Sequence, residues 1–152
     1  LGRIPFDTPD EWAWHEFARH EGPNQWRIRY IDLWMDSGRY HAEFGFQDSA
    51  ARLEGPEYRA LYHEYRGKAV IHPEGFVLED MTITQGSLPF GTCLAALGSG
   101  DKLVGLSLSE FRNTVIQVLP GTAGCTHLND ALRSLQDVVG MAGRLNELLE
   151  AA

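Results

Sequence analysis

A thiol, a hydroxyl and an imidazole follow one another in the last third of the chain. Cys125, Thr126 and His127 stand in the segment Gly121–Leu128, where a glycine-rich turn leads into a helix-like run. The start of a helix exposes unpaired backbone N–H groups and carries the positive end of the helix dipole, so it favours a thiolate or an anionic ligand. The segment predicts either a reactive site of this kind or an ordinary helix start, in which Thr126 caps the helix and the other two side chains pack inside.

A second imidazole, His63, lies in an aromatic, strand-like segment that is distant in sequence from His127. If the fold unites the two, a neutral imidazole can take a proton while a carboxylate, Glu43 or Asp48, holds its tautomer. We therefore take His63, His127, Glu43 and Asp48 as candidate catalytic residues.

Aromatic side chains surround these candidates and crowd the first third of the chain. They can build the core, or they can line the concave face of a curved sheet as a pocket for planar, apolar or phenolic ligands. The candidate substrate-binding residues are Tyr40, Tyr62, Tyr65, Trp34, Phe44, Cys125 and Thr126.

The chain also contains the donor types of a tetrahedral zinc site in His63, Cys93, Cys125 and His127. Neither cysteine belongs to a Cys-x-x-Cys pair, and only Cys125 and His127 form a local pair. We therefore expect no cofactor, with zinc on these four residues as the alternative.

Length, charge and cysteine content set limits on the class of protein. The 152 residues suit a single domain over residues 1–152, and two cysteines in an ordinary composition suit a reducing cytoplasm, with a single disulfide left open. No apolar stretch is long enough for a membrane span, and the acidic start differs from a signal peptide. A net charge of -8 without a Lys/Arg cluster disfavours nucleic acids. The expected partner is a small molecule, and a homo-oligomer is left open.

Hydrophobic periodicity predicts strands first and helices last. A change of phase near Tyr30 predicts a bulge in the first strand. We expect a helix over residues 8–20, strands over 26–35, 40–47, 58–71 and 76–84, a long loop over 86–100, and helices over 109–119 and 126–149, the last kinked at Gly140 and Gly143. The predicted fold is α+β: an antiparallel sheet of about four strands in two hairpins, with helices packed on one face, curved around a pocket.

Several short motifs occur in the order typical of one protein family. The most specific is Gly-Cys-Thr-His-Leu at Gly124–Leu128. Others are Glu43 with Asp48 five residues later, His63 at the start of a long strand, Asp80, Pro89-Phe90, Cys93, Leu103-Val104-Gly105 and Phe111. On these residues the core 38–128 resembles the bacterial domain-of-unknown-function family 2889. The resemblance implies that Glu43, Asp48, His63, Asp80, Cys93, Cys125, Thr126 and His127 converge, and it supplies no reaction.

The chain departs from that family at two places. Asp48-Ser49-Ala50 stands where the family commonly has Asp-Thr-Lys, and His63-Glu64-Tyr65 stands where it commonly has His-Asp-Met. The changes remove a cation and add an aromatic ring, which favours a less polar, aromatic ligand.

Taken together, these features predict a small-molecule enzyme without a cofactor. We expect a lyase or isomerase that performs acid/base chemistry on an aromatic, phenolic substrate, for example formaldehyde-releasing cleavage of a lignin-derived compound. His63 or His127 is the expected base, and a hydroxyl of Tyr40, Tyr62 or Tyr65 donates to the phenol. The alternatives are a non-catalytic ligand-binding or oligomerisation module, or a zinc-dependent domain.

Overall fold

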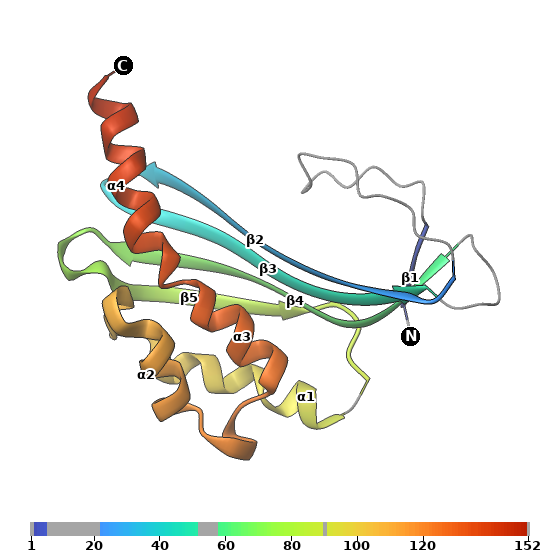
Figure 1. Cartoon of the computed structure of the whole chain (residues 1–152). Coiled ribbons are helices and arrows are strands. Elements are labelled where there is room, and N and C mark those ends of the chain that lie inside the picture. Colours follow the sequence, from blue (N-terminus) through green and yellow to red (C-terminus); the bar gives the residue numbers. More distant parts are fainter. Residues whose placement is uncertain (1, 6–21, 52–57, 90, 152) are drawn as a thin grey trace.

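The fold is an antiparallel sheet built around one long central strand, β4 (Figure 1). The computed structural model describes residues 2–5, 22–51, 58–89 and 91–151. The strands are β1 (Gly2–Pro5), β2 (Asn24–Asp36), β3 (Arg39–Ala51), β4 (Tyr58–His72) and β5 (Val77–Gln85). β2, β3 and β4 are neighbours in this order, and the other edge of β4 pairs first with β1 and then with β5. The predicted sheet of about four strands in two hairpins is confirmed, with the short β1 as an addition.

Helices from the second half of the chain cover one face of this sheet (Figure 1). The α-helices of the described residues are α1 (Gly91–Ala95), α2 (Phe111–Val118), α3 (Thr126–Ser134) and α4 (Asp137–Glu150). In α3 the buried residues Leu128, Ala131 and Leu132 repeat at the three- and four-residue spacing of a helix face. The predicted α+β class is therefore confirmed. None of the helices in the described part of the chain combines the length and apolar character that a membrane crossing requires.

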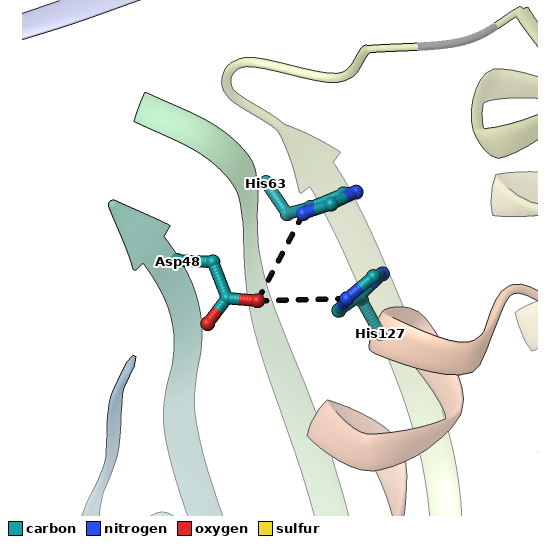
Figure 2. Close-up of side chains that lie close together, drawn as sticks. All are labelled: Asp48, His63 and His127. Carbon is teal, nitrogen blue, oxygen red and sulfur yellow. Dashed lines mark ion pairs between the residues drawn. The ribbon is translucent and has the colours of Figure 1, made fainter. Parts of the chain in front are cut away.

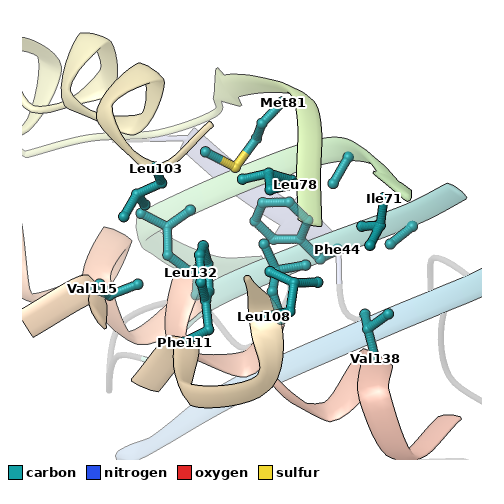
Figure 3. Close-up of a cluster of buried hydrophobic side chains, with 14 of the residues drawn as sticks. Phe44, Ile71, Leu78, Met81, Leu103, Leu108, Phe111, Val115, Leu132 and Val138 are labelled. Carbon is teal, nitrogen blue, oxygen red and sulfur yellow. The ribbon is translucent and has the colours of Figure 1, made fainter. Parts of the chain in front are cut away.

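The hydrophobic core lies between the helices and the covered face of the sheet. Alternate residues of β3 point into it, among them Tyr40, Ala42, Phe44 and Phe46, which are all nearly inaccessible to solvent. Figure 3 shows Phe44 and Ile71 of the sheet packed with Leu108, Phe111 and Leu132 from the helical half. Each large side chain buried in this way contributes about 1.5–3 kcal/mol to the free energy of unfolding.

A tight turn fixes the register of the first hairpin. Ser37 and Gly38 both have positive φ, 49° and 73°, as a two-residue turn between antiparallel strands requires. β2 then pairs with β3 without interruption from Asp36↔Arg39 to Asn24↔Ala51. The bulge predicted near Tyr30 is wrong: the phase change arises because Trp26, Ile28 and Tyr30 face one side of the sheet, whereas Ile31, Leu33 and Met35 face the helices.

Two of the predicted segments also differ from the structure. The region expected as a long loop over 86–100 instead contains α1 and a 3-10 helix over Leu97–Leu103, whose buried Leu103 packs in the core. The single helix expected over 126–149 is divided between Ser134 and Asp137, before either predicted kink glycine. At this break Gln136 accepts a hydrogen bond from the backbone N–H of Arg112, which ties the start of α4 to α2. The helix expected over 8–20 lies outside the described residues.

Gly67 gives a direct test of the core packing. It lies opposite Phe44 across β3 and β4, and a Cβ atom at this position would come within 2.2 Å of the Phe44 ring. Gly67→Ala should therefore lower the free energy of unfolding by about 1–3 kcal/mol in urea titrations. Gly98→Ala is the matched control, because no atom lies within 4 Å of its added Cβ. Equal stability of the two variants would show that Phe44 is not packed as described.

Candidate active site

A buried carboxylate lies at the centre of the candidate site. Asp48 is on the helix-covered face of β3 and is only 2% exposed. Arg27, directly opposite on β2, donates from Nε to Oδ1 and from Nη2 to Oδ2, both at 2.8 Å. A carboxylate without a partner is very costly to bury, whereas a two-point bond with a guanidinium offsets much of that cost and fixes the orientation of the carboxylate. Arg27 therefore holds the Asp48 carboxylate in one position.

His63 faces Asp48 from the opposite side. It is the register partner of Asp48 on β4, where a β-bulge at Tyr62 shifts the pairing so that Ser49 lies opposite Leu61. The Nδ1 atom of His63 lies 3.9 Å from Asp48 Oδ2. Bulges are common next to active sites because they redirect one side chain relative to its neighbours. Arg27, Asp48 and His63 consequently form one row across three adjacent strands.

His127 completes the group from α3, the helix that packs on the sheet beside these strands (Figure 2). It is the second residue of α3, and its Nε2 atom lies 3.5 Å from the same Oδ2 atom of Asp48. Its ring stacks on the His63 ring with centroids 3.6 Å apart and planes inclined by 21°. The next residue, Leu128, is fully buried and anchors this first turn in the core. The position of His127 is therefore set by helix packing.

The surroundings favour the neutral form of His63. Its side chain is 17% exposed, and Nδ1 is buried without a hydrogen-bond partner. Burial lowers the pKa of His63 below its usual 6.5, with further lowering from the charges of His127 and Arg27, against a raising effect of Asp48. Because Arg27 already neutralises Asp48, the carboxylate has less power to hold a proton on the ring. A neutral imidazole can accept a proton on one ring nitrogen while the other faces a carboxylate.

A second contact joins the same two elements next to the imidazoles. Tyr65, two residues after His63 on the same face of β4, donates its hydroxyl hydrogen to Cys125 Sγ at 3.2 Å. Burial raises the pKa of Tyr65, and the Cys125 sulfur raises it further, so the phenol stays a donor. Burial also raises the pKa of Cys125, but the Tyr65 hydroxyl, the backbone N–H groups of Leu128 and His127, and the Cys93 thiol outweigh it, so the pKa is lowered.

Only some of the residues that the family resemblance places together meet in the structure. Asp48, His63 and His127 meet, and Cys93 and Cys125 meet at Tyr65. Glu43 does not join them: five residues before Asp48, it lies on the opposite face of β3, where its carboxylate is 3.8 Å from Lys68 Nζ. Asp80 is exposed on β5.

Three of the seven candidate substrate-binding residues lie away from the imidazoles. Tyr40 is buried near the other end of β3, where its hydroxyl bonds to Asn146, and Phe44 is wholly inside the core. Trp34 is 43% exposed and stacks on His41 on the face without helices. Tyr65 and Cys125 are next to the imidazoles. Tyr62 occupies the bulge beside His63, and Thr126 is exposed between Cys125 and His127.

Sequence reasoning did not identify the basic partners of the site. Arg27 lies 3.9 Å from Asp130 on α3, and Arg29 bonds the same carboxylate at 3.1 Å, so the two arginines connect β2 to α3. The hairpin turn makes the pairing of Arg27 with Asp48 predictable from the sequence. A two-residue turn at Ser37–Gly38 pairs Asp36 with Arg39, and counting outward along both strands pairs Arg27 with Asp48.

The zinc set expected from sequence is not assembled as one group. The potential ligand atoms that lie within 4.8 Å of one another in the described residues come from Asp48, His63 and His127, without either cysteine. Two imidazoles and a carboxylate are ligand types for a divalent metal. However, both oxygens of Asp48 accept from Arg27 at 2.8 Å, so a metal ion would share the carboxylate with a permanent positive charge. The donor set therefore fits acid/base work better than metal binding.

Two hollows among the described residues are lined by side chains other than Asp48, His63 and His127. One holds about 30 Å³, the volume of a single water molecule, and is bordered by Phe46 and Tyr65 together with residues of the uncovered face. The other, of about 330 Å³, lies between β5 and the 3-10 helix over Leu97–Leu103. A shared aromatic pocket around the imidazoles stays a prediction.

Removing Arg27 tests whether it holds the buried carboxylate. Arg27→Met keeps the apolar stem but leaves Asp48 without its main partner, so the free energy of unfolding at neutral pH should fall by about 1–3 kcal/mol. Arg29→Met is the matched control: it removes an exposed pair with Asp130, for which about 0–1 kcal/mol is expected. Urea unfolding of the two variants makes the comparison, and an Arg27→Met protein as stable as the control would refute a structural role for the pair.

Comparison with known proteins identifies a family for the chain. No curated protein and no solved structure matches it. A family model described as "Protein of unknown function (DUF2889)" matches residues 25–140, more than half of the 152 residues. The matched region includes Arg27, Asp48, His63 and the Gly124–Leu128 motif. The chain therefore belongs to the DUF2889 family.

Proposed function

We propose that this protein is a cofactor-independent lyase or isomerase that performs acid/base chemistry on an aromatic small molecule. The observation that carries the proposal is the placement of two stacked imidazoles against one buried, arginine-held carboxylate. Such a group can take up and return a proton without a metal or a nucleotide. The presence of only two cysteines in an ordinary composition supports a reducing compartment such as the cytoplasm.

The positions of the side chains support a division of roles. His63, the more buried imidazole with a lowered pKa, is the base: its Nδ1 atom faces Asp48, and Nε2 takes the proton. His127, whose side chain is 26% exposed, stacks on it and donates the proton that the leaving group requires. Asp48 orients both rings through Oδ2. Its distances of 3.5 and 3.9 Å are longer than hydrogen bonds, as is common in an active site without substrate.

The aromatic surroundings support a phenolic substrate. The buried ring of Phe46 lies 5.6 Å from the His127 ring, and the buried ring of Tyr65 lies two residues from His63 on the same face. Flat apolar walls with a few polar groups are typical of sites for planar ligands. The lysine that is common in the family after Asp48 is replaced by Ala50, which makes the surroundings less polar.

A formaldehyde-releasing cleavage illustrates the chemistry that this site can supply. The base removes the proton of a primary alcohol on the side chain, and the adjacent C–C bond breaks as the C=O bond of formaldehyde forms. The electron pair of the broken bond becomes a C=C bond, and an aryl ether oxygen on the next carbon leaves as a phenoxide. The second imidazole protonates that phenoxide. The step is redox-neutral and requires one base and one acid.

A ligand screen coupled to product analysis tests the proposed activity. Phenolic biaryls with a primary-alcohol side chain are added to the protein, with their phenol methyl ethers as controls, and the melting temperature and released formaldehyde are measured. We expect the phenols to raise the melting temperature by mass action and at least one to be converted. Stabilisation without conversion of any compound would favour the non-catalytic binding module instead.

Histidine variants then test the assigned roles on a converted compound. His63→Ala and His127→Ala should each lower kcat/KM by about 10²- to 10⁴-fold, because each removes a proton-transfer group. His41→Ala, on the uncovered face against Trp34, is the matched control and should keep its activity. Asp48→Asn should also lower kcat/KM, because it changes the carboxylate that orients the rings. Glu43→Gln is its control and should keep its activity, because Glu43 lies on the opposite face of β3. A loss below about threefold in both imidazole variants, with intact folding, would remove the acid/base account.

A metal titration separates this proposal from a zinc-dependent domain. Protein treated with a chelator and then dialysed should keep its melting temperature, and added Zn²⁺ should not raise it by binding at Asp48, because Arg27 already occupies that carboxylate. Calorimetry with Zn²⁺ gives the direct measurement. Stoichiometric binding that is lost in His63→Ala and His127→Ala would reassign the site to a metal.

A further inference from the structure

Two cysteines that are distant in sequence lie at one tyrosine hydroxyl. Cys93 belongs to α1, and Cys125 immediately precedes α3. The Tyr65 hydroxyl donates to Cys125 Sγ at 3.2 Å, and the Cys93 thiol is in side-chain hydrogen-bonding contact with both Tyr65 and Cys125. Neither cysteine is in a disulfide. The fold therefore holds a reduced cysteine pair together, although three 3-10 helices and α2 separate its members in the sequence.

The two thiols differ in access and in their hydrogen-bond donors. Cys93 is 8% exposed, whereas Cys125 is partly accessible to solvent. The sulfur of Cys125 is the point on which the Tyr65 hydroxyl, the first backbone N–H groups of α3 and the Cys93 thiol converge. Donors of this kind stabilise a thiolate, which is the form that reacts with oxidants. Cys125 is thus the attacking thiol, and Cys93 is placed as the resolving thiol.

We propose that Cys93 and Cys125 form a reversible intramolecular disulfide in response to a hydroperoxide. The Cys125 thiolate attacks one peroxide oxygen, the O–O bond breaks, and the products are Cys125 sulfenic acid and hydroxide. The Cys93 sulfur then displaces the hydroxyl group, and the S–S bond forms with release of water. In sum, two thiols are oxidised and one hydrogen peroxide is reduced to two waters. The disulfide joins α1 to the start of α3.

This modification is independent of the proposed lyase activity, because it needs neither the imidazoles nor a substrate. It acts nevertheless beside them, since only Thr126 separates Cys125 from His127 at the start of α3. Disulfide formation also changes the Cys125 sulfur to which Tyr65 donates its hydrogen bond. A readout on the cysteines alone therefore tests the modification even if the proposed activity fails.

Mass spectrometry of the full-length protein provides the test. Reduced protein is treated with hydrogen peroxide, and the remaining thiols are alkylated with N-ethylmaleimide. We expect loss of both alkylation sites in the monomer, a mass lower by about 2 Da than that of the reduced chain, and a Cys93–Cys125 cross-linked peptide, all reversed by dithiothreitol. The proposal would be overturned if both thiols still alkylate, if each cysteine becomes a separate sulfinic acid, or if disulfide-linked dimers are the only oxidised product.

Single variants test the order of the two steps. In Cys93→Ser, peroxide should leave Cys125 as a sulfenic acid that dimedone traps, because the resolving thiol is absent. In Cys125→Ser, the buried Cys93 should keep its thiol at the same peroxide concentration. Sulfenic acid on Cys93 instead of Cys125 would contradict the assignment. Near-UV circular dichroism checks the folding of both variants, and the wild-type mass measurement decides the disulfide whether or not they fold.

Discussion

The ion pair between Arg27 and Asp48 is the interaction on which the rest of the site depends. A carboxylate that is almost wholly buried needs a partner, and Arg27 supplies two hydrogen bonds from the next strand. That partner has a second effect, because its charge reduces the pull of Asp48 on the protons of the neighbouring imidazoles. The site can thus contain a carboxylate that orients the rings while the lowered pKa of His63 favours its neutral form. The same ion pair therefore offsets the cost of burying Asp48 and favours the neutral form of His63.

The contact of α3 with β4 brings the two halves of the chain together. Two side chains of β4 on one face, His63 and Tyr65, meet two side chains at the start of α3, His127 and Cys125. The buried Leu128 and Leu132 anchor the helix in the core. Because the same turn supplies the imidazole and the thiol, any change in how α3 packs alters both groups together. The Gly124–Leu128 motif is therefore at once a helix start, a packing element and a source of reactive groups.

Local patterns in the sequence predicted the sheet well and the site only in part. Alternation predicted β2 to β5, and the family motifs brought Asp48, His63 and His127 into one set. Glu43 illustrates a signal that was available but not used, since an odd separation of five residues places it and Asp48 on opposite faces of a strand.

Other features depend on tertiary contacts that no local pattern contains. The bulge at Tyr62 sets His63 opposite Asp48, and its position depends on the pairing of β3 with β4 across a connection of several residues. The helical structure of the segment expected as a loop depends on burial of Leu103 beneath β5. The division between α3 and α4 likewise depends on a contact between Gln136 and Arg112.

Nuclear magnetic resonance of the histidine side chains, followed from about pH 5 to about pH 8, tests the central claim most directly. The account predicts that ¹H–¹⁵N correlations show His63 neutral at pH 7 with a pKa below 6.5, and that nuclear Overhauser effects connect the His63 and His127 rings. A His63 ring that is charged at pH 7, or that shows no contact with His127, would contradict it.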